Sequence, residues 1–408
     1  MKKIVGRTKG VIALALVVSL FGTTAYGAEA AEKTTTVEET AETEETTATE
    51  ETATAEDKAP VLTYEEALEK AKKKSIDLLN LQKANELLQE TKEDIWDAVG
   101  TFSIPTYDYQ KWVNDGVHAY TSAIYQTDSG MKQNKYTSQI ANLALEATLK
   151  STFASIVENE ENLAFLEEIS AVEKTVYEQG QAKLNLGMLS QYKLNELKAK
   201  YEKSKVNVSQ LEKSLDQMYI SLNNVIGEPT DQKYTIEYPA EFEPYVLQGN
   251  LEAYINASIN KDYGILLKEQ AVEDAKFNQN YLSESTTNET NKNNKFSYDS
   301  AKRTLKSAKE NKEIAIRNAY VQLQQAEDNY TQAEADLALV QADLKTAEVN
   351  YAIGNVTKLV LDQAQLAVTE KELALRKLSR EYDMQVFMFQ NPSLISSGSG
   401  ASSGEETA

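Results

Sequence analysis

The chain has 408 residues, a formal net charge of −21, no cysteine and a single histidine. The lack of cysteine excludes disulfides, thiolate catalysis and thiolate metal sites, and one histidine, His118, argues against a zinc or haem centre. The surplus of acids argues against nucleic acid, whose binding depends on Lys and Arg contacts to phosphate. We therefore expect no cofactor, no metal site and no nucleic-acid partner.

The N-terminus predicts an exported protein. Basic residues between Lys2 and Lys9 precede an apolar run from Val11 to Phe21, and small residues follow around Ala28. This order is typical of a secretory signal peptide, here residues 1–30. The apolar run is shorter than the ~20 residues that a membrane-spanning helix needs, although a retained anchor remains the alternative.

Two segments have the composition of disordered tails. Residues 31–59 are almost entirely Thr, Glu and Ala, with ten acids, two lysines and no aromatic residue. Such a segment cannot bury an apolar core, so we expect a disordered acidic Thr/Glu tail that serves as a solvated spacer. Residues 393–408 are rich in Ser and Gly and predict a second disordered tail.

Long proline-free stretches of Ala, Leu, Glu, Lys and Gln predict helices. Thr63 and Glu66 fit a capping box at the start of the first one. The expected helices cover roughly residues 63–98, 131–185, 190–226, 250–284, 297–352 and 357–390.

The helix over 297–352 carries the clearest heptad pattern. Apolar residues, many of them alanines, recur from Ala301 to Tyr351 at spacings of three and four, with Lys312 as the polar exception. A sustained seam of this kind specifies helices packed along their length. At 1.5 Å per residue this helix would be about 80 Å long. We therefore expect an all-α, or nearly all-α, fold: an elongated antiparallel coiled-coil rod or α-barrel.

The chain also repeats itself. Residues 60–229 and 230–392 each contain a helix, an interruption, a very long helix, a glycine break and a helix of about 35 residues. Residues 230–249 form the connector within the second part. This arrangement predicts two helical repeats built as duplicated long hairpins.

The glycine breaks read NLGMLS at 185–190 and AIGNVT at 352–357. Gly187 and Gly354 suit the position just after a helix, and Ser190 and Thr357 suit the N-cap of the next helix. Each break therefore predicts a helical hairpin. Leu189 and Val356, if exposed, are candidate docking contacts, and the alternative is a turn with no further role.

Together these features resemble the TolC-like outer-membrane efflux protein family over most of residues 62–392. The motifs are LTYEEALEKAKKKSIDL at 62–78, LNLGMLS at 184–190, LNNVIGEP at 222–229 and NYAIGNVT at 350–357. The resemblance implies a homotrimer in the cell envelope, placed in the outer membrane, whose helices form a hollow tube. It also implies that the tube contacts a periplasmic adaptor (membrane fusion) protein linked to an inner-membrane transporter. The implied adaptor-docking tip consists of Gly187, Leu189, Ser190, Gly354, Val356 and Thr357.

The sequence departs from the family in two places. Family members insert a β-hairpin after the first helix of each half, and three chains complete a membrane barrel. Here we expect at most a short hairpin around 99–130, where residues from Val117 to Tyr125 alternate, and residues 283–296 are too short and polar to cross lipid. A reduced or missing barrel, with membrane contact left open, is therefore expected.

The second departure concerns charge near the tip. Family members often carry an aspartate six residues after the tip glycine, where this chain has Lys193 and Val360. Glu196 and Asp362 lie nearby and are candidate lumen acids. The alternative is that both are solvated surface carboxylates.

The sequence contains no P-loop and no evident nucleophile–base pair, and we expect no enzyme. The leading hypothesis is a passive helical conduit of an efflux or export system that docks an adaptor and an inner-membrane pump. The alternative is an exported structural or scaffolding coiled-coil protein of the cell envelope without a transport role.

Overall fold

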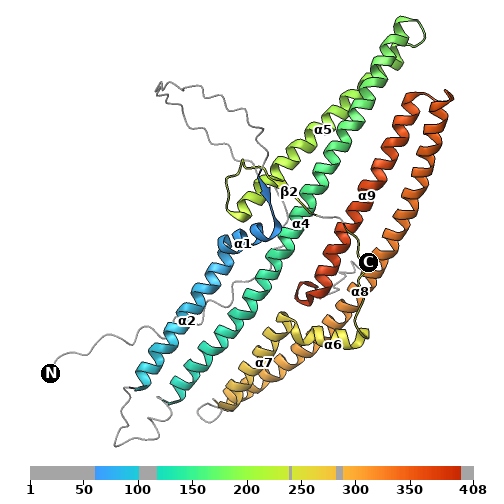
Figure 1. Ribbon diagram of the computed structural model, residues 1–408. Coiled ribbons are helices and arrows are strands. Elements are labelled where there is room, and N and C mark those ends of the chain that lie inside the picture. The colour runs from blue at the N-terminus through green and yellow to red at the C-terminus, as the bar shows by residue number, and fades with distance from the viewer. Residues whose placement is uncertain (1–59, 101–116, 239–240, 282–287, 397–408) are drawn as a thin grey trace, which may run out of the picture. The chain divides into compact units, whose positions relative to one another are not determined.

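The computed structural model describes residues 60–100, 117–238, 241–281 and 288–396, all within one unit that spans residues 58–408. Nearly all of these residues are helical, as predicted (Figure 1). Strands β1 (Val61–Leu62) and β2 (Thr235–Ile236) pair in parallel. The helices are α1 (Tyr64–Lys74), α2 (Ile76–Gly100), α4 (His118–Asn185), α5 (Gln191–Ile226), α6 (Leu251–Lys261), α7 (Tyr263–Tyr281), α8 (Asn288–Ala352) and α9 (Lys358–Gln390), followed by the 3-10 helix η4 (Pro392–Leu394).

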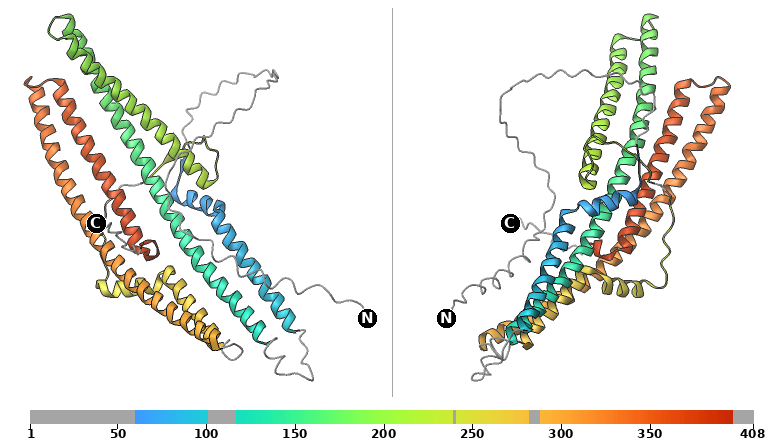
Figure 2. Two further views of the ribbon diagram at one scale, coloured as in Figure 1. Left: turned by 180° about the vertical axis from the view of Figure 1, so that it is seen from behind. Right: turned by 60° about the vertical axis from the view of Figure 1, so that its left-hand side comes forward.

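Four of these helices form one layer. Helix α4 packs against α5 on one side and α9 on the other, and α9 packs against α8. The order across the layer is therefore α5, α4, α9, α8, and it is the same in every view (Figures 1 and 2). The α4–α5 and α8–α9 hairpins turn at the same end of the layer. Helices α2 and α7 pack beside α4 toward the other end.

The heptad seam of α8 is confirmed. Its positions from Ala301 to Ala347 are all buried or half-buried, whereas Tyr351 at the end of the helix is exposed. Because the seam faces α9, α7 and α6, one face of α8 is covered along most of its length.

Two helix breaks were not predicted. Ser75 separates α1 from α2, and Asp262 separates α6 from α7. Each residue caps the helix that follows: Ser75 Oγ accepts the Leu78 N–H at 3.4 Å, and Asp262 Oδ1 accepts the Ile265 N–H at 2.7 Å. A Ser or Asp side chain competes for backbone N–H groups in this way, so one residue ends a helix inside a helix-forming run.

The sequence allowed at most a short β-hairpin around 99–130, and the second part of that range is helical. Helix α4 begins at His118, not near residue 131, so the alternating run that ends at Tyr125 is helical. Packing against α7 outweighs the strand-like alternation: Tyr125 stacks on Phe277 with ring centroids 3.8 Å apart, and Ser129 is buried. Residues 101–116 lie outside the described residues.

The expected interruption at 283–296 is shorter than predicted. Helix α8 begins at Asn288, not near residue 297, so the polar run up to Phe296 belongs to the helix. Residues 282–287 lie outside the described part of the chain.

Each half has its own apolar core. The first gathers Leu149, Phe153 and Ile156 of α4 with residues of α5, α1 and the two strands. The second gathers Ile316 and Leu323 of α8 with residues of α6 and α9. Leu149 and Ile316 have the same separation in sequence as Ile156 and Leu323, and as Gly187 and Gly354. The two long helices therefore use equivalent positions for their cores.

A tyrosine–glutamate pair closes each core. The Tyr219 hydroxyl on α5 donates to Glu160 Oε1 on α4 at 2.6 Å, and it also lies 2.8 Å from the Tyr234 carbonyl. The Tyr382 hydroxyl on α9 donates to Glu327 on α8 and accepts the Tyr245 N–H at 2.7 Å. Burial, with the adjacent carboxylate, raises the pKa of both hydroxyls. Each pair thus ties a hairpin to the segment that joins the two halves.

These tyrosines make stability sensitive to alkali. Their pKa is raised in the folded chain, so their contribution is fully present below the ordinary tyrosine pKa of about 10 and is lost as the pH rises. We expect the free energy of unfolding, measured in urea, to stay level up to about pH 10 and to fall steadily as the pH rises above it. The double variant Y219F/Y382F should be less stable at neutral pH and show a shallower fall. An equally steep fall in that variant would contradict the assignment.

Lys312, the polar exception in the seam, is buried in an ion pair. Its Nζ lies 3.0 Å from Asp262 Oδ2, and the two side chains are 8% and 1% exposed. Nζ also donates to the carbonyls of Pro392 at 3.0 Å and Ile395 at 2.7 Å. Lys312 therefore joins α8, the break between α6 and α7, and the turn after α9.

Removing Lys312 should be costly. K312M leaves the Asp262 carboxylate buried and unpaired, and loss of one partner of a buried ion pair typically costs about 3–5 kcal/mol. In urea denaturation we expect the free energy of unfolding of K312M to fall by that amount. The free energy of unfolding of D262N/K312M should fall less, because no charge is buried in that variant. The control is K306M, which removes the exposed pair between Lys306 and Glu310 and should cost less than about 1 kcal/mol. Equal losses in K312M and K306M would refute a special role for Lys312.

Candidate docking tips

The two hairpin turns share one backbone conformation. Gly187 and Gly354 have φ values of 70° and 77°, in the left-handed region that favours glycine. The Gly187 N–H donates to the Leu184 carbonyl and the Met188 N–H to the Lys183 carbonyl, both at 2.8 Å. The second turn has an equivalent pair of bonds, which are donated by the N–H group of Gly354 and by that of the next residue. This is a Schellman motif in each half, and both glycines have the conformation expected from the sequence.

The helix that follows each turn is capped differently in the two halves. Ser190 and Thr357 both have extended backbones at the N-cap. The Ser190 Oγ accepts the Lys193 N–H at 3.2 Å, as predicted. The Thr357 hydroxyl makes no capping bond, and its carbonyl accepts the Val360 N–H at 3.1 Å instead. The predicted capping by the Thr357 side chain is therefore wrong.

Leu189 and Val356 are half-buried and hold the turns closed. A methyl group placed on Gly180 of α4 would lie 3.6 Å from Leu189 Cδ2 and 3.3 Å from Leu194 Cδ1, so both leucines cover the same spot. This arrangement is a hydrophobic staple, which fixes the chain as it enters a helix. Val356 and the buried Leu361 occupy the same positions in the second tip. Leu189 and Val356 are thus packing residues more than exposed contacts.

The apolar side chains that do face outward are others. Leu186, Met188 and Tyr192 of the first tip are 74%, 73% and 80% exposed, and Ile353 of the second tip is 65% exposed. We call these four residues the tip patch. Leu186 and Ile353 precede the tip glycines, where the left-handed turn leaves their side chains outside the hairpin. That position in the motif could have been read from the sequence.

The two tips are not equivalent. Met188 corresponds to Asn355 in the second tip, so most of the tip patch belongs to the first. The Glu158–Lys377 ion pair at 2.8 Å fixes the register of α4 against α9. The part of α4 between Glu158 and the first tip is longer than the part of α9 between the second tip and Lys377. At 1.5 Å per residue the first tip therefore projects roughly 10 Å beyond the second. The difference is visible in Figure 2.

The candidate lumen acids are paired with lysines of their own helices. Glu196 accepts from Lys193 Nζ at 2.8 Å, and this bond lowers the pKa of the Glu196 carboxyl. Asp362 pairs with Lys358 one turn earlier. Both acids lie close to the tips, each beside a compensating charge.

No protein-family model and no curated protein sequence matches the chain. Solved structures do match its fold. The CmeC outer-membrane channel of Campylobacter jejuni matches with a TM-score of 0.58 and 13% identity, over 82% of this chain and 86% of CmeC. The outer-membrane protein VceC of Vibrio cholerae matches with a TM-score of 0.56 and 14% identity, over 81% of this chain and 96% of VceC. A membrane protein of Pseudomonas aeruginosa matches with a TM-score of 0.59 and 11% identity, over 82% and 93% of the two chains.

The chain has the fold of TolC-like outer-membrane channels. This fold is found in proteins described as outer-membrane channels. None of the helices in the described ranges is both long enough and apolar enough to cross a bilayer.

Substituting the tip glycines should loosen the turns. A methyl group on Gly187 or Gly354 would meet no atom within 4 Å, so its cost is the left-handed backbone alone, about 1–2 kcal/mol. We expect G187A to speed hydrogen exchange of the Met188 amide about tenfold or more, and G354A to do the same at Asn355. G187N should have a smaller effect, because Asn tolerates this conformation. Unchanged exchange in both alanine variants would refute the strain argument.

Proposed function

We propose that the chain is a passive helical conduit of an envelope export system, which assembles as a homotrimer and docks an adaptor protein through its tips. The observation that carries the proposal is the tip patch. Two structurally equivalent turns lie at the same end of the layer, and they present Leu186, Met188, Tyr192 and Ile353 to solvent. Apolar side chains gathered at an exposed end are typical of a binding surface.

The proposal assigns separate roles to the residues of the tips. Gly187, Gly354 and Ser190 set the backbone, while Leu189 and Val356 hold it from within. The tip patch makes the contact with the adaptor. Because aromatic and large flexible apolar side chains tend to dominate interface energies, Tyr192 and Met188 are the expected anchors.

The remaining parts of the chain fit the same proposal. Residues 1–30 direct export and are removed, and residues 31–59 are a spacer. Residues 60–229 and 230–392 are the two helical repeats, and Ser393 and Ile395, which the sequence assigned to the tail, bond to the second repeat. Energy for transport comes from an inner-membrane transporter bound to the adaptor. Glu196 and Asp362 are the lumen acids of this proposal, near the entrance of the conduit, and each is paired with a lysine of its own helix.

The tip patch can be tested by charge substitution. In L186D/M188D two exposed apolar contacts become carboxylates, so the partner would have to bury unpaired charges. We expect the affinity for the adaptor protein that the unsubstituted chain captures in a pull-down to fall at least about 30-fold, which corresponds to the ~2 kcal/mol of an interface hot spot. The measurement is calorimetric titration of purified proteins, with helicity checked by circular dichroism.

The matched control is V206D. Val206 is an apolar residue of α5 that is 52% exposed but lies away from the tip. It should leave adaptor binding unchanged. Equal binding by L186D/M188D and the unsubstituted chain would refute the docking tip. Failure of the unsubstituted chain to bind any adaptor would favour the alternative of a structural coiled-coil protein without a transport role.

A further inference from the structure

Helix α8 differs in charge between its two parts. Residues 292–317 include eight lysines or arginines and three acids, whereas residues 318–352 include one lysine and six acids. Helices α6 and α7 pack on the basic part, away from the tips (Figure 1). In a chain with a net charge of −21, such a basic segment is a candidate site for an anionic ligand.

A groove runs along this basic part of α8 and has a volume of about 590 Å³. Its apolar lining consists of Ile259 of α6, Val272 of α7 and Leu305 of α8, which are buried or half-buried. The lining residues of α8 extend from Tyr298 to Glu313, which is about 22 Å of helix at 1.5 Å per residue. We call this site the α6–α8 groove. Its volume is in the range of small-molecule sites, and its length suits an extended ligand better than a single ion.

Two of the three lysines in the α6–α8 groove are available to a ligand. Lys302 forms no ion pair within the described part of the chain, and Lys306 lies 3.8 Å from Glu310 in a largely exposed pair. Exposed pairs of this kind contribute little, so both ammonium groups can bind an acid group of a ligand. Lys309 is already bound, because its Nζ lies 2.6 Å from Glu269 Oε1.

The α6–α8 groove also offers hydrogen-bonding groups of both kinds. Asn260 makes no side-chain hydrogen bond to any described residue, so its amide can donate and accept. The Asn256 amide donates to the Glu252 carbonyl at 2.9 Å, which leaves its own oxygen as an acceptor. Glu313 accepts two bonds from Arg317 through Oε1, and its Oε2 can accept another.

These groups together suit a sugar chain that carries spaced acid groups. Sugar hydroxyls both donate and accept, as the amides and carboxylates of the groove require. The apolar faces of sugar rings can pack on the apolar lining and on the ring of Tyr298, whose centre lies 5.3 Å from Lys302 Nζ. A ligand charged along its whole length would be repelled by Glu310 and Glu313, which also line the groove.

We propose that the α6–α8 groove binds an anionic glycan, with carboxylates of the glycan on Lys302 and Lys306 and hydroxyls on Asn256 and Asn260. The inference goes beyond the proposed function, because it attaches the chain to an acidic polysaccharide of the cell envelope through a site away from the tips. That role rests on the proposed export of the chain, whereas binding itself does not.

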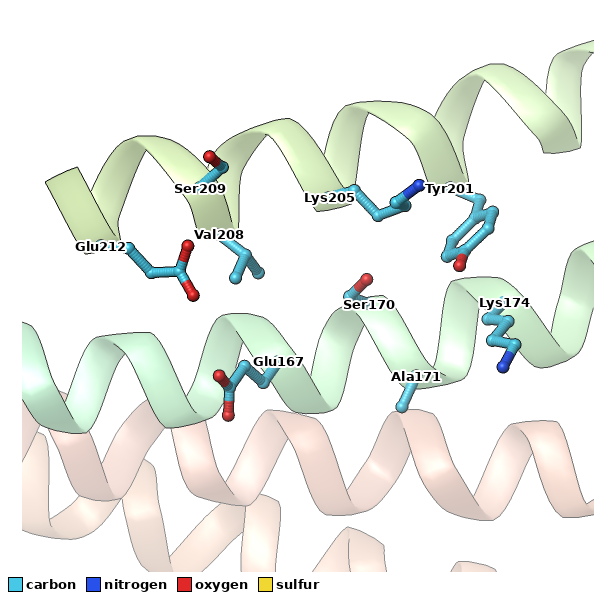
Figure 3. A pocket seen from close by; sticks show the side chains of 9 residues that line it. All are labelled: Glu167, Ser170, Ala171, Lys174, Tyr201, Lys205, Val208, Ser209 and Glu212. Atoms are coloured by element: carbon cyan, nitrogen blue, oxygen red, sulfur yellow. The ribbon is translucent and has the colours of Figure 1, made fainter. Parts of the chain in front are cut away.

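The groove between α4 and α5 provides a matched comparison (Figure 3). It has a volume of about 310 Å³, and Lys174 and Lys205 lie at one end of it. Lys205 Nζ lies 5.5 Å from the centre of the Tyr201 ring, much as Lys302 lies beside Tyr298. None of the described residues that line this groove has an amide side chain. It therefore shares the lysines and the ring but lacks the hydrogen-bonding groups that the proposal requires.

Calorimetric titration of the purified chain with a tetramer of galacturonic acid tests the site. We expect saturable binding that weakens as salt is added. Both K302A/K306A and N256A/N260A should weaken it at least about tenfold, because a hydrogen bond to a charged group contributes about 1.5–3 kcal/mol and 1.4 kcal/mol is tenfold. The control K174A/K205A should bind as the unsubstituted chain does. Circular dichroism should show the same helicity in all variants.

Two further ligands distinguish a glycan site from plain charge attraction. Cellotetraose, a neutral tetramer, should bind at least about tenfold more weakly than the acidic one. Inorganic tetraphosphate should also bind more weakly, and equal or tighter binding of it would overturn the glycan assignment. Absence of binding by the acidic tetramer, or an equal loss in K174A/K205A, would overturn the site. The tip variant L186D/M188D should bind the tetramer normally, so failure of the docking tip and failure of the groove are separate results.

Discussion

Lengthwise packing of two very long helices against their return helices is the constraint on which the rest of the structure depends. Small and branched residues at heptad positions bring α8 close to α9, and Gly180 lets α4 approach α5 in the same way. A methyl group on Gly180 would lie 2.7 Å from Leu197 Cδ1, so a larger residue there would have to displace this leucine side chain. The packing sets the register, and the register decides which residues reach the tips, the connector and the breaks.

The parts of the fold that could be predicted from the sequence follow repeated patterns. The seam of α8 offers a signal at every turn of the helix, and the two glycine turns carry the same motif twice. The breaks at Ser75 and Asp262 each depend on one side chain, and the start of α4 depends on Tyr125 meeting Phe277, which is distant in sequence. Periodicity carries no information about such single contacts.

The same distinction applies to the tips. Their backbone was predicted correctly because Gly187 and Gly354 need a left-handed conformation that few other residues adopt. Leu189 and Val356 were expected to make contacts only if exposed, and both are half-buried because they fold back as staples. The direction of a side chain next to a turn depends on whether the following helix has an apolar residue for it to pack against. Here Leu194 and Leu361 are those residues. Leu186 and Ile353 have no such partner position.

The tie between Lys312 and the last turn of the chain has a consequence for the order of folding. Every buried residue of the first core lies between Leu62 and Ile236, so this core can be complete once the chain has been made as far as Ile236. The second core includes Phe389, and Lys312 needs the carbonyl of Ile395. A chain that is made from the N-terminus onward can therefore fold its first hairpin early. The other hairpin must wait for almost the last described residue.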